Sequence, residues 1–135
     1  MKKVLCFGTF DILHDGHKEF LKDAKKYGNF LIVNVISDKL VYENKKKYII
    51  NKQIDRIKNL KKLGIVDKII KVSDNLEENL KMIGSLKPDV IVFGYDQKTD
   101  FRDKLKDFLD SVNIKPEYKE SKEFAGGIHS SHLRK

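Results

Sequence analysis

Short apolar segments alternate with helical patterns along the chain, and this alternation restricts the possible folds more than any other feature. Five segments rich in β-branched and aromatic residues have the length of strands: Lys3–Phe7, Phe30–Ile36, Lys68–Val72, Val90–Phe93 and Lys115–Lys119. The second of these is too apolar for a strand with one face in water, so it suits a parallel sheet that is covered on both faces.

Helical patterns fill the intervals between these segments. They predict a first helix that carries Phe20, Leu21 and Ala24 and ends near Gly28, a second that Asn51 caps and Gly64 ends, two more over Leu76–Leu86 and Phe101–Val112, and a short final helix starting at Ser130. Strands that alternate with helices in this way are typical of an α/β fold. We therefore expect a Rossmann-like, doubly wound sheet of about five parallel strands with helices on both faces.

The chain length and its apolar segments limit the organisation of the protein. At 135 residues, we expect a single domain over residues 1–135. No apolar run is long enough to cross a membrane, and Met1 to Val4 lead directly into the first strand, so we expect a cytoplasmic protein without a membrane partner. The one cysteine, Cys6, lies inside an apolar strand, where a small buried residue is expected rather than a nucleophile.

The formal net charge of +8 is concentrated in one segment. Nine of the basic residues lie between Lys39 and Lys62, against the two acidic residues Glu43 and Asp55. A lysine-rich, solvated helix would explain this, and so would a region that faces an anion. Nucleic acid is not the expected partner, because the chain has no helix-turn-helix, zinc-finger or aromatic RNP-type signature.

The residues that follow the first strand carry the chemistry. In doubly wound sheets, ligands bind beyond the carboxyl ends of the strands. Here Gly8-Thr9-Phe10-Asp11 precedes His14-Asp15-Gly16-His17 at the start of a helix, whose N-terminal N–H groups attract anions. The two histidines could be structural, or could bind zinc with further ligands such as His129 and His132, but a pair of imidazoles that donate to a phosphate fits better.

These two segments resemble the GTFD and HxGH signature of a nucleotidyltransferase superfamily that includes glycerol-3-phosphate cytidylyltransferase and archaeal FAD synthase. Further motifs occur in the order found in that family: Lys46-Lys47, Arg56, Gly94-Tyr95-Asp96 and Gly127-Ile128-His129-Ser130-Ser131. The resemblance therefore extends over almost the whole chain. It implies that a phosphate oxygen of an acceptor attacks the α-phosphorus of a nucleoside triphosphate, and that pyrophosphate leaves.

The resemblance also implies roles for individual residues. The catalytic set would be His14, His17, Lys46 (or its neighbour Lys47) and Arg56. Nucleotide contacts would come from Gly8, Thr9, Phe10, Asp11, Gly16, Gly94, Asp96, His129, Ser130 and Ser131, although Asp11 and Asp96 could instead be capping carboxylates. A divalent cation, Mg²⁺, would bind mainly through the triphosphate, with no metal ligands supplied by the protein.

The motifs leave the nucleotide base and the acceptor open. We favour CTP, because the segment Ile36–Leu40 resembles the cytidylyltransferases. We expect a small phosphorylated alcohol such as glycerol 3-phosphate or a polyol phosphate as the acceptor, because the short chain has no large aromatic-lined insertion. The alternative is ATP-dependent adenylyl transfer to FMN, as in FAD synthase, which the segments around Gly94 and His129 resemble more closely. A non-catalytic nucleotide-binding module is the remote alternative. The family resemblance and the short chain also lead us to expect a homodimer.

Overall fold

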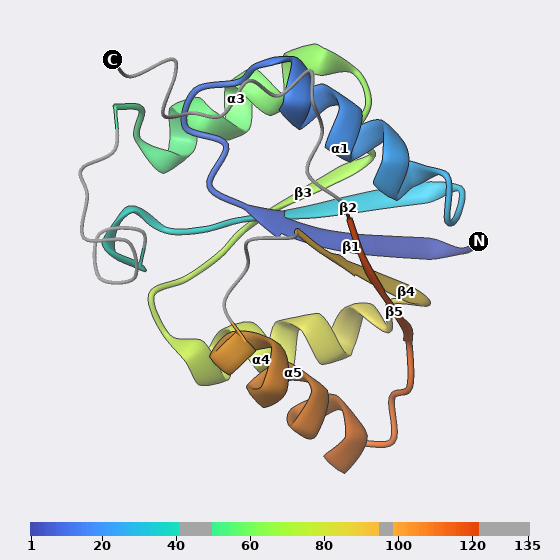
Figure 1. The fold of residues 1–135 in the computed structure, drawn as a ribbon. Coiled ribbons are helices and arrows are strands. Elements are labelled where there is room, and N and C mark those ends of the chain that lie inside the picture. The colour runs from blue at the N-terminus through green and yellow to red at the C-terminus, as the bar shows by residue number, and fades with distance from the viewer. Residues whose placement is uncertain (41–49, 95–98, 122–135) are drawn as a thin grey trace.

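The fold is built on one parallel sheet. The structure is a computed structural model, and it describes residues 1–40, 50–94 and 99–121 (Figure 1). Its strands are β1 (Lys3–Gly8), β2 (Phe30–Val35), β3 (Lys68–Lys71), β4 (Val90–Phe93) and β5 (Glu117–Glu120). They lie in the order β3-β2-β1-β4-β5, and each neighbouring pair is parallel. The predicted five-stranded parallel sheet is therefore confirmed.

The last strand begins two residues later than predicted. The sequence indicated Lys115–Lys119, whereas β5 begins at Glu117. Pro116 has no N–H to donate to a neighbouring strand, and the first bond to the strand at its side is made by the Glu117 N–H to the Asp89 carbonyl. The proline therefore sets the start of the strand.

Helices cover both faces of the sheet, as predicted. They are α1 (Asp15–Lys25), α3 (Gln53–Leu63), α4 (Leu76–Leu86) and α5 (Thr99–Ser111). Figure 1 shows α1 and α3 on one face and α4 and α5 on the other. This arrangement is a Rossmann-like α/β fold. Among the described residues, no helix is long and apolar enough to cross a membrane. The short helix predicted from Ser130 lies outside the described residues.

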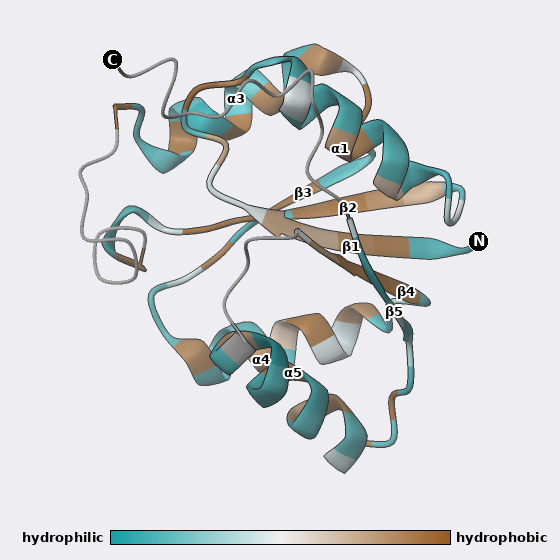
Figure 2. Cartoon of the chain, viewed as in Figure 1, coloured by the Kyte–Doolittle hydropathy of each residue, from teal (hydrophilic) through white to brown (hydrophobic). Residues whose placement is uncertain are grey.

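Alternate residues of each strand fill two separate cores. In β1, Cys6 packs with Leu21 of α1 and Leu60 of α3, whereas Leu5 packs with Leu105 and Leu109 of α5. The central strands β1, β2 and β4 are predominantly hydrophobic in Figure 2, whereas the helices alternate between hydrophobic and hydrophilic residues. The prediction that Cys6 is a small buried residue is confirmed, because its side chain is inaccessible to solvent and burial raises the pKa of its thiol.

The start of α3 differs from the prediction that Asn51 caps it. The N-cap position is Lys52, whose side chain makes no capping bond. Instead, a carboxylate oxygen of Asp38 accepts the N–H of Gln53, the first helical residue, at 3.0 Å. The predicted end of this helix is confirmed, because Gly64 adopts a left-handed conformation (φ 71°) that favours glycine.

The strand order reverses between β1 and β4, and this places the functional site. After β1, the chain crosses successively to β2 and β3 on one side, then returns to β4 and β5 on the other. Helices α1, α3, α4 and α5 each begin at the edge of the sheet where the strands end, which is called here the carboxyl edge (Figure 1). In open parallel sheets, ligands bind at this edge beside the point of reversal. The loops after β1 and β4 are therefore the candidates.

Candidate functional site

The two histidines form a reciprocal cap at the start of α1. His14 is the N-cap residue and His17 is the third residue of the helix. The Nδ1 atom of His14 accepts the N–H of Gly16 at 3.1 Å, and Nδ1 of His17 accepts the N–H of His14 at 3.3 Å. The centroids of the two rings are 3.9 Å apart. The sequence prediction that the two rings lie on the same side of the first turn is confirmed.

These bonds determine which nitrogen of each imidazole carries the proton. A nitrogen that accepts a hydrogen bond from a backbone N–H must present its lone pair, so Nδ1 is unprotonated and the neutral ring carries its proton on Nε2. Burial lowers the pKa of His14 below its ordinary value of 6.5, against the opposing effect of the neighbouring Asp15 carboxylate. The cap thus leaves His14, near neutral pH, as an uncharged donor through Nε2.

The ring of Phe10 packs against the imidazole of His17. The ring centroids of Phe10 and His17 lie 5.4 Å apart in an edge-on arrangement, and the Phe10 ring is buried in the core beneath α1. Its backbone has φ +53°, in the left-handed region that a bulky residue rarely adopts. Any Cβ at Gly8 would overlap the Phe10 ring. The resemblance implied a nucleotide contact at Gly8, and in the structure the absence of a side chain at Gly8 makes room for this aromatic ring.

Asp11 holds backbone that lies far away in the sequence. Its two carboxylate oxygens accept the N–H groups of Ile50 and Asn51, each at 2.7 Å, and its carbonyl accepts the side-chain amide of Asn51 at 2.6 Å. The residue is buried, with 6% of its surface exposed. Of the two roles that the sequence left open for Asp11, these contacts favour the structural carboxylate over a contact to ribose, base or acceptor.

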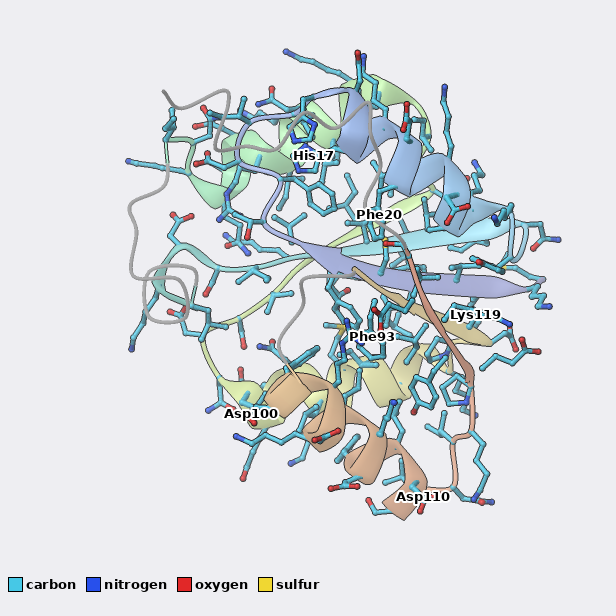
Figure 3. All side chains as sticks on the ribbon, in the orientation of Figure 1. His17, Phe20, Phe93, Asp100, Asp110 and Lys119 are labelled. Carbon is cyan, nitrogen blue, oxygen red and sulfur yellow. The ribbon has the colours of Figure 1, made fainter. Side chains whose placement is uncertain are left out.

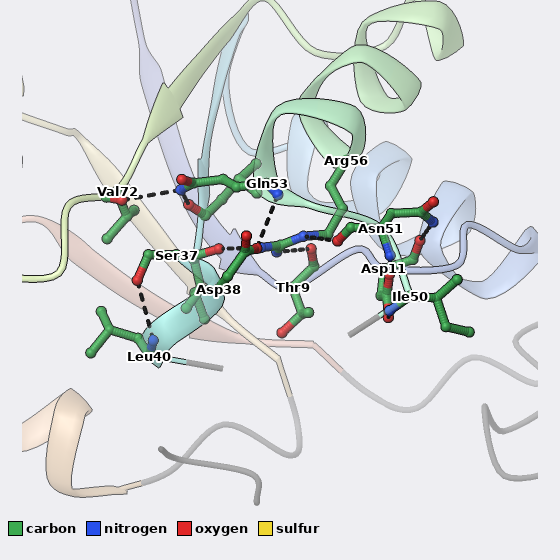
Figure 4. Close-up of polar contacts among 12 residues, drawn as sticks. Thr9, Asp11, Ser37, Asp38, Leu40, Ile50, Asn51, Gln53, Arg56 and Val72 are labelled. Carbon is green, nitrogen blue, oxygen red and sulfur yellow. Dashed lines mark hydrogen bonds and ion pairs between the residues drawn. The ribbon is translucent and has the colours of Figure 1, made fainter. Parts of the chain in front are cut away.

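Arg56 is fully buried and makes four hydrogen bonds inside the protein. It donates to the carbonyl oxygens of Asn51, Thr9 and Ile36 and to the Asp38 carboxylate, the last at 2.6 Å (Figure 4). These contacts argue against the sequence prediction that Arg56 contacts the triphosphate or the acceptor. The guanidinium instead joins the loop after β1, the loop after β2 and the start of α3.

The same junction includes a buried amide. Gln53 donates from Nε2 to the carbonyl oxygens of Val35 and Val72, at 2.8 and 3.0 Å, and so ties together the ends of β2 and β3 (Figure 4). We call the group formed by Asp11, Asp38, Asn51, Gln53 and Arg56 the polar junction. Sequence reasoning missed the roles of Asp38 and Gln53 in it. A signal was present for Asp38, because an acidic residue shortly after the end of a strand can accept the N–H groups at the start of a helix.

Other predicted residues occupy the carboxyl edge with internal contacts. Gly16 is buried and its N–H is used by His14, and the Thr9 carbonyl is used by Arg56. Within the described part of the chain, the Thr9 hydroxyl oxygen is buried without a hydrogen-bond partner. Gly94 follows β4, and its carbonyl accepts a bond from Arg102 of α5 at 2.6 Å. The predicted site residues Lys46, Asp96, His129, Ser130 and Ser131 lie outside the described residues.

The basic segment does not lie entirely at the carboxyl edge. Helix α3 begins at this edge and runs back along the sheet, so Lys61 and Lys62, in its last turn, lie at the opposite end of the helix. There they interact favourably with the negative end of the helix dipole. Arg56 is neutralised by Asp38. Part of the positive charge between Lys39 and Lys62 therefore takes part in contacts within the fold.

The described residues offer no protein cage for a metal ion. Among residues 1–40, 50–94 and 99–121, no group of three or more His, Cys, Asp or Glu side chains is arranged to hold one. The carboxylate oxygens of Asp11, in the loop between β1 and α1, already accept two backbone N–H groups. Mg²⁺ prefers oxygen ligands and often binds through substrate phosphates, so this donor set fits a cation that enters with a triphosphate.

A family profile and two proteins of known name are similar to this chain over most of its length. The sequence profile of the family described as Cytidylyltransferase-like matches residues 5–135. The FAD synthase of Pyrococcus abyssi is 43% identical over 115 residues, which cover 85% of this chain and 76% of that protein. The FAD synthase of Thermoplasma acidophilum is 33% identical over 133 residues, covering 98% and 91% of the two chains.

A solved structure shares the fold. The crystal structure described as the lipopolysaccharide core biosynthesis protein from Thermoplasma volcanium superposes with a TM-score of 0.81 at 32% identity. The match covers 92% of this chain and 98% of that one. The similarity therefore includes the described sheet and helices.

These relatives correct one prediction from the sequence. We favoured cytidylyl transfer to a small phosphorylated alcohol, and this preference is wrong, because relatives at 33 to 43% identity carry the name FAD synthase. The error came from treating the absence of a large aromatic insertion as a sign of a small acceptor. The prediction of a nucleotidyltransferase itself is confirmed by the family match. With its parallel sheet, its histidine cap at the carboxyl edge and its profile match over residues 5–135, this chain belongs to the cytidylyltransferase-like family of nucleotidyltransferases.

Proposed function

We propose that this protein transfers AMP from ATP to the phosphate of FMN, forming FAD and pyrophosphate. The observation that carries the proposal is the name FAD synthase on relatives that are 33 to 43% identical over most of the chain. The histidine cap at the carboxyl edge supports it, since it supplies oriented donors where phosphates would bind.

The reaction needs positioning more than it needs a base. A phosphate oxygen of FMN attacks the α-phosphorus of ATP, one P–O bond forms, and the bond between the α-phosphorus and the bridging oxygen breaks as pyrophosphate leaves. The attacking phosphate is already ionised near neutral pH. The protein must therefore align the two phosphates in line and stabilise the charge that develops around the α-phosphorus.

His14 and His17 are the proposed donors to this phosphate. Their Nδ1 atoms are engaged in the cap, so each Nε2 carries the proton in the neutral ring. Donors that are fixed before the substrate binds stabilise a developing charge without reorganisation. The capping role and the catalytic role of the histidines therefore use different nitrogens of the same rings.

The remaining phosphate contacts are proposed from the family resemblance. Lys46 would neutralise the triphosphate, and Ser130 and Ser131 would bind its β- and γ-phosphates. Backbone N–H groups of Thr9 and Phe10 would add donors beside the histidines. Gly94, Asp96 and His129 would contact the nucleotide. Mg²⁺ bound to the triphosphate would neutralise part of its charge.

The prediction of a homodimer can be tested by sedimentation equilibrium.

A substrate matrix tests the proposed function. The purified protein with Mg²⁺ is incubated with ATP or CTP, each with FMN or glycerol 3-phosphate, and both pyrophosphate release and FAD formation are measured. We expect pyrophosphate and FAD in equal amounts with ATP and FMN, and no product in the other three mixtures. FAD absent from the ATP and FMN mixture would contradict the proposal.

His17→Ala tests the catalytic role of the cap. Loss of one transition-state donor is expected to lower turnover by about a hundredfold. The unfolding free energy should fall by no more than about 1 kcal/mol, because one capping bond is lost. Phe20→Leu, on the same helix but beyond its first turn, serves as the control and should keep its turnover. Unchanged turnover in His17→Ala would make the cap purely structural.

A further inference from the structure

One polar side chain in the sheet is buried among apolar residues. Asn34 of β2 is 1% exposed, and its Oδ1 atom has no hydrogen-bond partner within the described part of the chain. It lies in register with Phe7 of β1 and Ile70 of β3. Both of these side chains belong to the apolar cluster beneath α4 and α5, as does Ile32 two residues earlier in β2. Alternation along the strand therefore places the Asn34 carboxamide on the α4/α5 face.

This carboxamide lowers the stability of the fold. A buried oxygen without a hydrogen bond loses its contact with water and gains nothing in return, and such groups are rare in folded proteins. A leucine, whose side chain has the same number of heavy atoms and is apolar, would suit these surroundings better. A residue that opposes stability at a site edge is best explained by a contact that forms only when a ligand binds.

Asn34 lies on the side of the sheet from which the acceptor is expected to approach, opposite to the leaving pyrophosphate. It is the residue before the last of β2, at the carboxyl edge, and the following pair in the register is Val35 with Gly8 at the end of β1. The histidine cap lies on the α1/α3 face of the sheet, and Figure 3 shows His17 on that side and Phe93 on the other. In-line transfer requires the acceptor to approach from the side opposite to pyrophosphate. The proposed function puts the triphosphate at the histidine cap on the α1/α3 face, so the acceptor would extend towards the α4/α5 face.

The surroundings of Asn34 on that face suit a flat ring. Its neighbour Phe7 stacks on Phe93 with ring centroids 6.0 Å apart, and Phe101 of α5 meets Phe7 edge-on at 5.3 Å. Aromatic side chains favour contact with other planar rings. Ligand sites are typically lined by apolar side chains with a few polar groups that fix the orientation of the ligand.

We propose that the Asn34 carboxamide recognises the ring system of the acceptor by accepting a hydrogen bond from its imide N–H. The inference rests on the proposed function, which makes the acceptor a flavin. The pyrimidine part of the flavin ring carries one imide N–H between two carbonyl groups, and a carboxamide is complementary to that edge because it offers an acceptor beside a donor. Asn34 is thus a specificity-determining residue for the acceptor and not for the nucleotide.

Asn34→Leu separates this role from a structural one. The chain contains no tryptophan, so quenching of flavin fluorescence reports FMN binding without interference from that residue. We expect the variant to bind FMN about tenfold more weakly, which is the loss of one hydrogen bond. Its affinity for ATP, measured by calorimetric titration without FMN, should stay within about twofold, and its melting temperature should be equal to or higher than that of the wild type.

Two further variants complete the test. Ile32→Val, on the same strand and face, is the matched control: it should lower the melting temperature and leave FMN affinity unchanged. Asn34→Ala provides the binding measurement if the leucine does not fit. The inference is overturned if both Asn34 variants melt several degrees earlier and bind FMN normally, or if ATP affinity falls instead. Wild-type protein that forms no FAD would reject the proposed function first, and the inference with it.

Discussion

The two faces of the sheet are built by different forces. On the α1/α3 face, the polar junction joins three segments at the carboxyl edge through a buried guanidinium, a buried carboxylate and a buried amide. On the α4/α5 face, Leu105 and Leu109 pack on an apolar and aromatic layer. Hydrophobic burial has no direction, whereas hydrogen bonds fix atoms relative to one another. The difference indicates that the α4/α5 face mainly supplies stability, whereas the α1/α3 face defines the geometry of the site loops.

The largest effect is expected from Arg56→Met, which removes the centre of the polar junction. Three backbone carbonyls and the Asp38 carboxylate would lose their donor. An acceptor left without its donor inside the protein costs about 1–3 kcal/mol, and three carbonyls are affected, so the free energy of unfolding measured with urea should fall by about 3 kcal/mol or more. The exposed pair of Lys115 and Asp110 provides the control, and Lys115→Met should cost less than about 1 kcal/mol.

The opposite result for Arg56 is equally informative. If Arg56→Met kept its stability while the KM for ATP rose, the guanidinium would be a phosphate ligand, as the sequence predicted. The polar junction would then contact the substrate directly and would not act only by fixing the site loops.

A cavity on the α4/α5 face should lower the free energy of unfolding about as much as Arg56→Met does, but should not affect the site. Leu105 is fully buried beneath the sheet, and Leu105→Ala is expected to lower the free energy of unfolding by about 3 kcal/mol. At a temperature where the variant is folded, turnover and both KM values should match the wild type, because Leu105 belongs to the apolar cluster of this face. A large change in KM would show that the α4/α5 face positions the substrates more tightly than its packing suggests.

Asp11→Asn should have an intermediate effect. The amide keeps one oxygen acceptor but turns an NH₂ group towards a backbone N–H that Asp11 accepts in the wild type, at Ile50 or Asn51. One unsatisfied buried donor costs about 1–3 kcal/mol, which chemical denaturation would measure. Asp103→Asn on the exposed surface of α5 is a suitable control. A stable Asp11→Asn enzyme with a raised KM would instead support a direct substrate contact.

The smallest expected effect is a dependence on pH at the histidine cap. Burial lowers the pKa of His14 below 6.5, so in acid the unfolded chain binds a proton more readily than the folded one. Stability should therefore increase as the pH rises from the lowered pKa towards about 6.5, the unfolded value. His14→Asn keeps a capping side chain but cannot titrate, and its stability relative to the wild type should improve as the pH falls through this range. A wild type that gains stability in acid relative to this variant would contradict the cap.

The fold was predictable because its signals are local. The apolar runs that became β1 to β4, the glycine that ends α3 and the single buried cysteine each depend on a few consecutive residues. The boundary of β5 was misplaced because a proline acts on the strand that follows it. The cap of α3 was misassigned to Asn51, because its acceptor, Asp38, comes from a preceding loop.

The site was only partly predictable, because its contacts join distant segments. The pattern of His14 and His17 indicated two imidazoles on one side of a helix, but the protonated nitrogen follows only from the bonds to Nδ1. Arg56 matched a family position, yet its pairing with Asp38 depends on how α3 meets the segment after β2. Asn34 is a single polar residue in an apolar run, and its orientation became clear only from the register with Phe7 and Ile70.

The burial of Cys6 makes this thiol a natural reporter of the integrity of the sheet. It is the only cysteine in the chain and lies in β1, the central strand, with no exposed surface. A thiol reagent can modify it only when β1 separates from the helices above it, so the rate of labelling measures that opening under native conditions. Slower labelling in the presence of ATP, FMN or both would then report ligand binding in variants that have lost all turnover.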